Sequence, residues 1–163
     1  MRDVPRGGSN EAVAARIGRR ERSEEFSHES KIRNLYAKRL EFERPLERFV
    51  KKEVTYRDSA IRADMRTVDC NGLLREWEFK IHADYQALGQ ILIYVAHARQ
   101  ELGFRPVQGV IAAFSFLPEL RRTVDLMNFN IELLMLPSWM RAAGCVPPDS
   151  KPVRLVSIPN IKF

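Results

Sequence analysis

Apolar and charged side chains follow a helical spacing through the first third of the chain. From about Ser30 to Lys52 the apolar positions recur every three or four residues, which predicts an amphipathic helix. Pro45 lies inside this stretch and lacks the backbone N–H that a helix interior needs. We therefore expect two short helices or one helix kinked near Pro45. The apolar positions are Ile32, Leu35, Tyr36, Leu40, Phe42, Leu46, Phe49 and Val50.

The spacing then changes to the alternation that is typical of strands. Residues 53–58, 61–69 and 73–80 are predicted as strands, and residues 69–72, with the sequence DCNG, as a hairpin turn between the last two. These strands are therefore expected to be neighbours in one sheet.

Helical and strand patterns alternate in the second half. Residues 84–102 have helical spacing, with Asp84 as a possible cap and Gly103 just after the end. A strand, a helix and another strand follow, and after Pro137 a short helical piece and a final strand are weaker predictions. Their ranges are 106–116, 117–128, 130–137 and, for the final strand, 153–158. This order predicts an α/β fold with a central mixed sheet flanked by helices.

The strand at residues 73–80 has two chemically different faces. Side chains alternate along a strand, so Glu76, Glu78 and Lys80 share one face while Trp77 and Phe79 share the other. By itself the charged face is typical of a solvated strand with ion pairs to arginines of the preceding strand, Arg62 and Arg66.

The hairpin turn decides what lies opposite Glu78. A type I turn closed by a left-handed Gly72 pairs Asp69 with Leu73, so that paired residue numbers sum to 142 and Asp64 faces Glu78. A two-residue turn would instead pair Cys70 with Leu73 and place Asp64 on the wrong face. We favour the first turn because it keeps both faces consistent.

Two carboxylates that face one another repel unless a cation lies between them. Oxygen ligands of this kind favour a hard ion, Mg²⁺ or Mn²⁺. With the ammonium group of Lys80 alongside, this arrangement is suited to hydrolysis of a phosphodiester.

The order of Asp64, a hairpin and Glu78-Phe79-Lys80 resembles the PD-(D/E)xK nuclease superfamily, which has a restriction-endonuclease-like fold. Residue 63 is Ala rather than the Pro in the superfamily's name, a position where members often differ. The following stretch from Gln90 to Tyr94, QILIY, is similar to the QxxxY motif of the RecB-like branch.

The resemblance also implies roles for individual residues. Asp64 and Glu78 would bind Mg²⁺ or Mn²⁺, joined by an acid from the helix before the hairpin, for which Glu47 is our choice and Glu43 its rival. Lys80 would orient or help to deprotonate the attacking water. Gln90 would hold Lys80 or a nucleotide, and Tyr94 would contact a backbone phosphate.

Composition narrows the class of partner. The chain has 163 residues, is 45% hydrophobic and carries a formal net charge of +6, which suits one compact domain that binds a polyanion such as DNA. We expect a polar and basic arm at residues 1–25 and a nuclease-like domain at 26–163. A homodimer is expected if both strands of a duplex are cut.

Several classes of protein are disfavoured. Two cysteines cannot supply a four-thiolate zinc or iron–sulfur site, and the glycines do not form a phosphate-binding Walker A loop, so no nucleotide cofactor is expected. No apolar run is long enough to span a membrane, and a cytoplasmic protein is expected, located in the host cytoplasm if the origin is viral.

The sequence therefore predicts a metal-dependent deoxyribonuclease with Asp64, Glu78, Lys80 and Gln90 as catalytic residues. Two alternatives stay open. One is a nucleic-acid-binding subunit of a replication or recombination complex that has no catalytic activity, and the other is a structure-selective Holliday junction resolvase.

Overall fold

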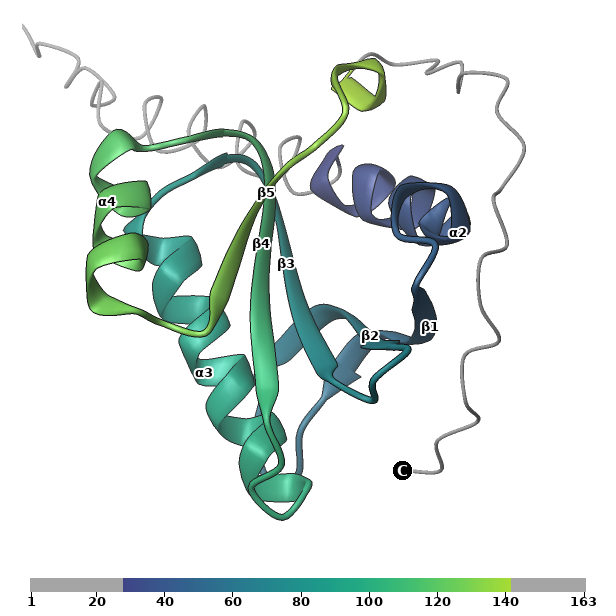
Figure 1. The fold of residues 1–163 in the computed structure, drawn as a ribbon, viewed down its shortest axis with the longest axis vertical. Helices are drawn as coiled ribbons and strands as arrows, with labels where there is room; N and C mark the ends of the chain where they lie inside the picture. The colour runs from purple at the N-terminus through teal and green to yellow at the C-terminus, as the bar shows by residue number, and fades with distance from the viewer. Residues whose placement is uncertain (1–27, 142–163) are drawn as a thin grey trace, which may run out of the picture.

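A computed structural model describes residues 28–141 (Figure 1). The proposed N-terminal arm at residues 1–25 and the weak strand at residues 153–158 lie outside the described residues. Within them, the structure is a single α/β domain in which helices cover both faces of a mixed sheet.

Five strands form the sheet in the order β1-β2-β3-β4-β5. The first three make an antiparallel meander, whereas β4 runs parallel to β3 and β5 runs parallel to β4. The strands are β1 Glu47–Thr55, β2 Arg62–Asp69, β3 Leu74–Ala83, β4 Val107–Phe116 and β5 Ile131–Met135. Because neighbouring parallel strands need a long crossover, a helix follows each of β3 and β4. These helices are α3 Tyr85–Glu101 and α4 Pro118–Met127.

Each face of the sheet has its own hydrophobic core. Helical residues 28–38 and α2 Leu40–Glu43 cover one face, where Tyr36 packs against Trp77 and Phe79 with ring centroids 5.5 and 5.6 Å apart. The short helix η1 Ser138–Arg141 adds Met140 to this core. Helices α3 and α4 lie over the opposite face, as Figure 1 shows.

The hairpin between β2 and β3 has the bulged turn that the sequence predicts. The Asp69 N–H donates to the Leu73 carbonyl at 3.0 Å, and the Gly72 N–H donates to the Asp69 carbonyl at the same distance. Gly72 has a φ of 84°, in the left-handed region that glycine enters most easily. The ladder confirms the predicted register from Val68–Leu74 to Met65–Trp77, but it ends before the predicted pair of Asp64 with Glu78.

Residues 47–55 form strand β1, and the predicted continuation of the helix to Lys52 is wrong. Helix α2 ends at Glu43, ahead of Pro45, which disfavours helical backbone in the residue before it. Beyond it, β2 offers backbone partners from Arg62 to Asp69, and this pairing outweighs the helical spacing of the apolar side chains. The strand expected at residues 53–58 therefore begins six residues earlier.

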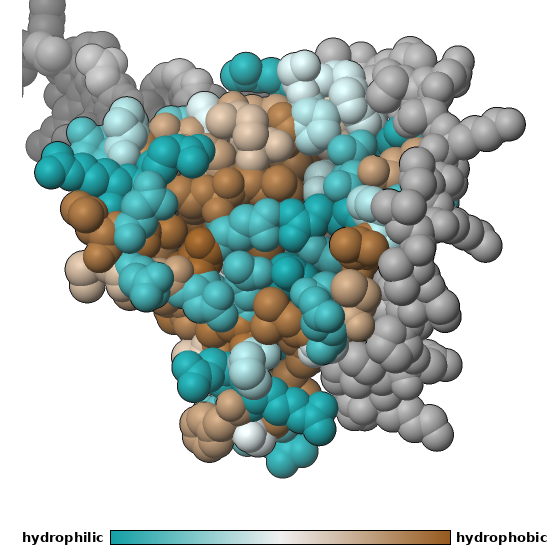
Figure 2. Space-filling view, viewed as in Figure 1, coloured by the Kyte–Doolittle hydropathy of each residue, from teal (hydrophilic) through white to brown (hydrophobic). Residues whose placement is uncertain are grey.

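The remaining elements agree with the sequence patterns. Asp84 caps α3, its carboxylate accepting from the N–H groups of Gln86 at 2.9 Å and Ala87 at 3.3 Å. No helix within residues 28–141 is long and apolar enough to span a membrane. Figure 2 shows apolar side chains interrupting the polar surface on the side of α4 and β5. The ends of these elements supply exposed Leu126, Met127 and Met135, none of which lines the pocket described next.

Candidate active site

Strands β2 and β3 separate at the point where the candidate acids lie. Their ladder runs from Val68–Leu74 to Met65–Trp77 and stops there. The next N–H on this side of β3, that of Phe79, donates to the side chain of Asp64 at 2.8 Å instead of to the backbone of β2. The separated strands open a pocket of about 760 Å³.

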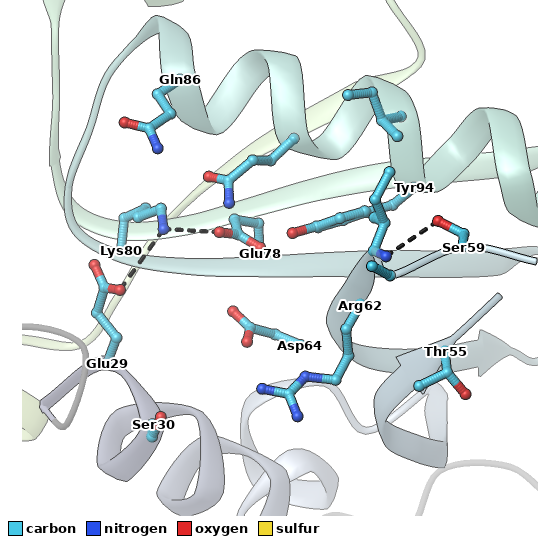
Figure 3. A pocket seen from close by; sticks show the side chains of 14 residues that line it. Glu29, Ser30, Thr55, Ser59, Arg62, Asp64, Glu78, Lys80, Gln86 and Tyr94 are labelled. Atoms are coloured by element: carbon cyan, nitrogen blue, oxygen red, sulfur yellow. Dashed lines mark hydrogen bonds and ion pairs between the residues drawn. The ribbon is translucent and has the colours of Figure 1, made fainter.

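The pocket contains the acids and the lysine that the sequence predicts. Asp64 from β2 and Glu78 and Lys80 from β3 all line it, and Figure 3 shows their side chains facing the same space. Lys80 Nζ lies 2.8 Å from Glu78 Oε1 and 3.6 Å from Glu29 Oε2. The Lys80 ammonium group therefore lies beside two acids from neighbouring strands.

Burial disfavours the charged forms of both acids. Burial raises the pKa of Glu78 to about 7, and the nearby Asp64 carboxylate adds to this rise. Burial also raises the pKa of Asp64, although the Phe79 N–H and Arg33 favour its charged form. Burial disfavours the charged form of Lys80, but the surrounding carboxylates outweigh this and raise its pKa, so Lys80 is held as a cation.

Helix α3 forms the opposite wall with Gln86, Gln90, Ile93 and Tyr94. The Tyr94 hydroxyl is directed at Glu78 in Figure 3, and burial together with that carboxylate raises the pKa of Tyr94. The Gln90 Oε1 atom is buried and has no hydrogen-bond partner within the described part of the chain. An unpaired buried carbonyl of this kind is costly unless a ligand uses it.

The helix of residues 28–38 brings two residues to the site that the sequence analysis missed. Glu29 lines the pocket beside Lys80 and accepts from the Ile81 N–H at 3.4 Å. Arg33, one helical turn later, lies 3.4 Å from Asp64 Oδ1 and 3.3 Å from Glu53 Oε1. Their spacing of four residues, next to the buried stripe of Ile32 and Tyr36, is a signal that could have identified them.

Glu47 does not reach this pocket, which corrects its choice as a third metal ligand. It begins β1 opposite Asp69, near the hairpin turn, whereas Asp64 lies five residues away along β2. Its carboxylate is buried among other partners, accepting from Arg44 Nε at 2.6 Å and from Thr67 Oγ1 at 2.8 Å. Glu43, the rival choice, lines the same separate cavity as Glu47.

The charged face of β3 is not a solvated surface. Glu76 and Glu78 are only 0% and 4% exposed, because α3 covers this face of the sheet. Glu76 receives a hydrogen bond from Arg66 Nε at 2.6 Å, as an ordinary cross-strand pair would. Arg62 pairs with Glu53 at 3.8 Å instead, which leaves Glu78 facing the pocket with Lys80.

The residues in the pocket suit a hard cation, although the protein's own ligands are few. Residues 28–141 contain no group of three or more His, Cys, Asp or Glu side chains placed to hold a metal ion. Asp64 and Glu78 supply two carboxylates, and the unpaired Gln90 oxygen lines the same space. Mg²⁺ commonly keeps several waters and takes one or two carboxylates plus substrate phosphates, so this donor set fits it.

Solved structures of other proteins share this fold. A crystal structure of a repair endonuclease from Pyrococcus abyssi superposes with a TM-score of 0.52 at 23% identity, covering 63% of this chain and 46% of that chain. EndoMS in apo form gives a TM-score of 0.52 at 23% identity, covering 68% and 47%. The EndoMS-dsDNA2 complex gives a TM-score of 0.50 at 21% identity, covering 64% and 45%.

The chain spans less than half the length of these structures. At such identities the similarity establishes the fold alone. The sequence matches no model of a known protein family, and no curated protein matches it.

Proposed function

We propose that this protein is a metal-dependent DNA nuclease whose site is the pocket between β2 and β3. The observation that carries the proposal is the convergence of Asp64, Glu78 and Lys80 in one pocket, with both acids disfavoured in their charged forms by burial. The fold shared with a repair endonuclease from Pyrococcus abyssi supports this assignment. Another structural neighbour, EndoMS, is bound to double-stranded DNA, which supports DNA as the polyanion.

Each side chain of the pocket has a role in this proposal. Asp64 and Glu78 hold Mg²⁺ or Mn²⁺, with help from the Phe79 carbonyl, which lies on the same side of the strand as its N–H. The bound ion supplies Lewis-acid stabilisation and lowers the pKa of a water. Lys80 orients that water and stabilises charge that develops on the phosphate oxygens. Glu29 keeps the Lys80 ammonium in place from the other side.

The two residues of α3 act on the nucleotide. Gln90 has an unused acceptor that can receive a hydrogen bond from a base or sugar. The Tyr94 hydroxyl, which is directed at Glu78 in the DNA-free protein, exchanges this contact for a backbone phosphate. Placement of both residues in the pocket is consistent with the QxxxY pattern, and on this basis we propose kinship with the RecB-like branch. A homodimer would present two such pockets to a duplex.

Cleavage assays test the proposal directly. Labelled linear, nicked, branched and single-stranded DNA is incubated with Mg²⁺ or Mn²⁺ and with wild type, Asp64→Ala, Glu78→Ala or Lys80→Ala. Loss of cutting in all three variants, with Arg122→Ala on α4 as an active control, is the expected result. Unchanged cutting by these variants would remove the proposal. The panel of substrates also separates a junction resolvase from a nuclease that cuts linear DNA.

A further inference from the structure

Glu53 occupies an unusual position next to the proposed metal site. The register of β1 on β2 places it beside Asp64, between the pairs Lys52–Met65 and Val54–Ala63. Its φ of 53° lies in the left-handed region that side chains other than glycine rarely adopt. An acid next to Asp64 adds repulsion to a site that already holds two carboxylates.

Two arginines share one oxygen of this residue. Glu53 Oε1 lies 3.3 Å from Arg33 Nη2 and 3.8 Å from Arg62 Nη1. Arg33 is fixed, because its side chain is only 6% exposed and its other terminal nitrogen reaches Asp64. Arg62 and Glu53 are 47% and 44% exposed, so both can exchange this contact for water or for a ligand.

Arg62 also differs from the other cation of the pocket. Among the residues that line the pocket, Lys80 and Arg62 are the two cations, and Lys80 is already paired with Glu78. Arg62 lies two residues before Asp64 on the same strand, and Figure 3 shows it beside Asp64 at the edge of the pocket. Of the two pocket cations, the Arg62 guanidinium is therefore the better placed to bind an anionic ligand.

The geometry points to a second phosphate site. We propose that Arg62 binds a backbone phosphate of DNA adjacent to the cleaved position, and that the Glu53 carboxylate occupies the position of this phosphate in the DNA-free protein. A phosphate oxygen accepts from guanidinium groups as a carboxylate oxygen does. Phosphate binding displaces the exposed Glu53 side chain into water, whereas the buried Arg33 remains on Asp64. This inference rests on the proposed function in that the phosphate is one of DNA.

A double-mutant cycle on DNA binding tests the exchange. Binding of labelled single-stranded and duplex oligonucleotides is followed by fluorescence anisotropy in EDTA, so that no cleavage occurs. The proteins are wild type, Arg62→Ala, Glu53→Gln and the double variant. The melting temperatures of all four proteins are compared first. Equal values are expected, because both substituted side chains are exposed.

We expect coupling between the two positions. Arg62→Ala should weaken binding about five-fold and Glu53→Gln should strengthen it about five-fold, the size of one exposed charge pair. The double variant should bind like Arg62→Ala, because Glu53 no longer has a phosphate-binding cation to mask. The slope of log affinity against log salt should fall by about one with Arg62→Ala.

Control variants separate this exchange from a general charge effect. Arg122→Ala and Asp125→Asn make the same charge changes on α4, which contributes no residue to the pocket, and should change affinity less. Additive effects that return the double variant to wild-type affinity would overturn the proposal, as would wild-type protein that binds neither oligonucleotide. Coupling without any cleavage in Mg²⁺ or Mn²⁺ would leave the phosphate site standing and reject the nuclease.

Discussion

The carboxylate of Asp64 accepts the Phe79 N–H at 2.8 Å and so replaces the backbone of β2 as the partner of β3. This single contact ends the β2–β3 ladder while it fixes one oxygen of the candidate metal ligand. The other oxygen of Asp64 faces Arg33. Carboxylate oxygen atoms that are held from two sides in this way need little reorganisation to receive a cation.

Metal binding should therefore stabilise the folded protein through Asp64. Mn²⁺ at one hundred times its dissociation constant is expected to add about 2.7 kcal/mol to the free energy of unfolding. In a thermal melt this should raise the midpoint of wild type and of Asp125→Asn by several degrees. Asp64→Asn should show no such shift. An equal shift in Asp64→Asn would place the ion elsewhere.

Stability of the metal-free protein should fall between about pH 4.5 and pH 7. Burial raises the pKa of Glu76 to about 7 from an ordinary value of 4.5, and Glu78 is shifted to about 7 as well. The unfolded chain releases these protons at lower pH than the folded protein does, so stability that is present below pH 4.5 is lost as pH rises through 7. The loss is up to about 3 kcal/mol for each group.

Urea unfolding in EDTA at pH 5 and pH 7.5 measures this loss. Glu76→Gln lacks one of the two titrating groups and should show a smaller difference between the two pH values, whatever its mean stability. Wild type that is equally stable at both pH values would contradict the prediction.

The bulged turn depends on the left-handed conformation of Gly72. Gly72→Ala should lower the free energy of unfolding by about 1–2 kcal/mol, because its φ of 84° brings a Cβ too close to the backbone. Gly89→Ala is the matched control, since Gly89 lies within α3 and a Cβ there meets nothing within 4 Å. That change should stabilise the protein by up to about 1 kcal/mol. Chemical denaturation of both variants distinguishes these opposite signs.

Glu47 should matter for stability and not for metal binding. Glu47→Gln leaves the half-buried cations Arg44 and Arg75 without their shared carboxylate, although each keeps a second acidic partner, and is expected to cost about 1–2 kcal/mol of stability. Calorimetric titration of the folded variant with Mn²⁺ should give the wild-type affinity. Glu41→Gln, an exposed acid on α2, should change neither quantity. A loss of affinity as large as that of Asp64→Asn would return Glu47 to the metal site.

Local sequence patterns identified the central part of the site because its geometry is set over short distances. The turn at DCNG fixes the register up to Met65–Trp77, and Asp64 and Glu78, the next residue on each strand, both line the pocket. The cap at Asp84 begins α3 at the position that brings Gln90 and Tyr94 to the opposite wall. Each of these relationships depends on residues close in sequence.

Predictions from the sequence failed where tertiary contacts determine the local structure or the environment of a side chain. The apolar spacing of residues 47–52 fits a helix, but these residues form a strand because their backbone pairs with the edge of β2. Glu29 lies more than 50 residues from Lys80 in sequence, and only the packing of its helix on the sheet brings the two together. The burial of Glu76 likewise depends on α3, which no pattern within β3 reveals.

The pocket lies where two neighbouring strands separate. Met65 and Trp77 are the last paired residues of the ladder, and the position of this pair sets the distance between Asp64 and Glu78. Fraying by one more residue pair would move the acids apart while the rest of the sheet stays closed. Warming should therefore abolish ion binding at a temperature below that of global unfolding.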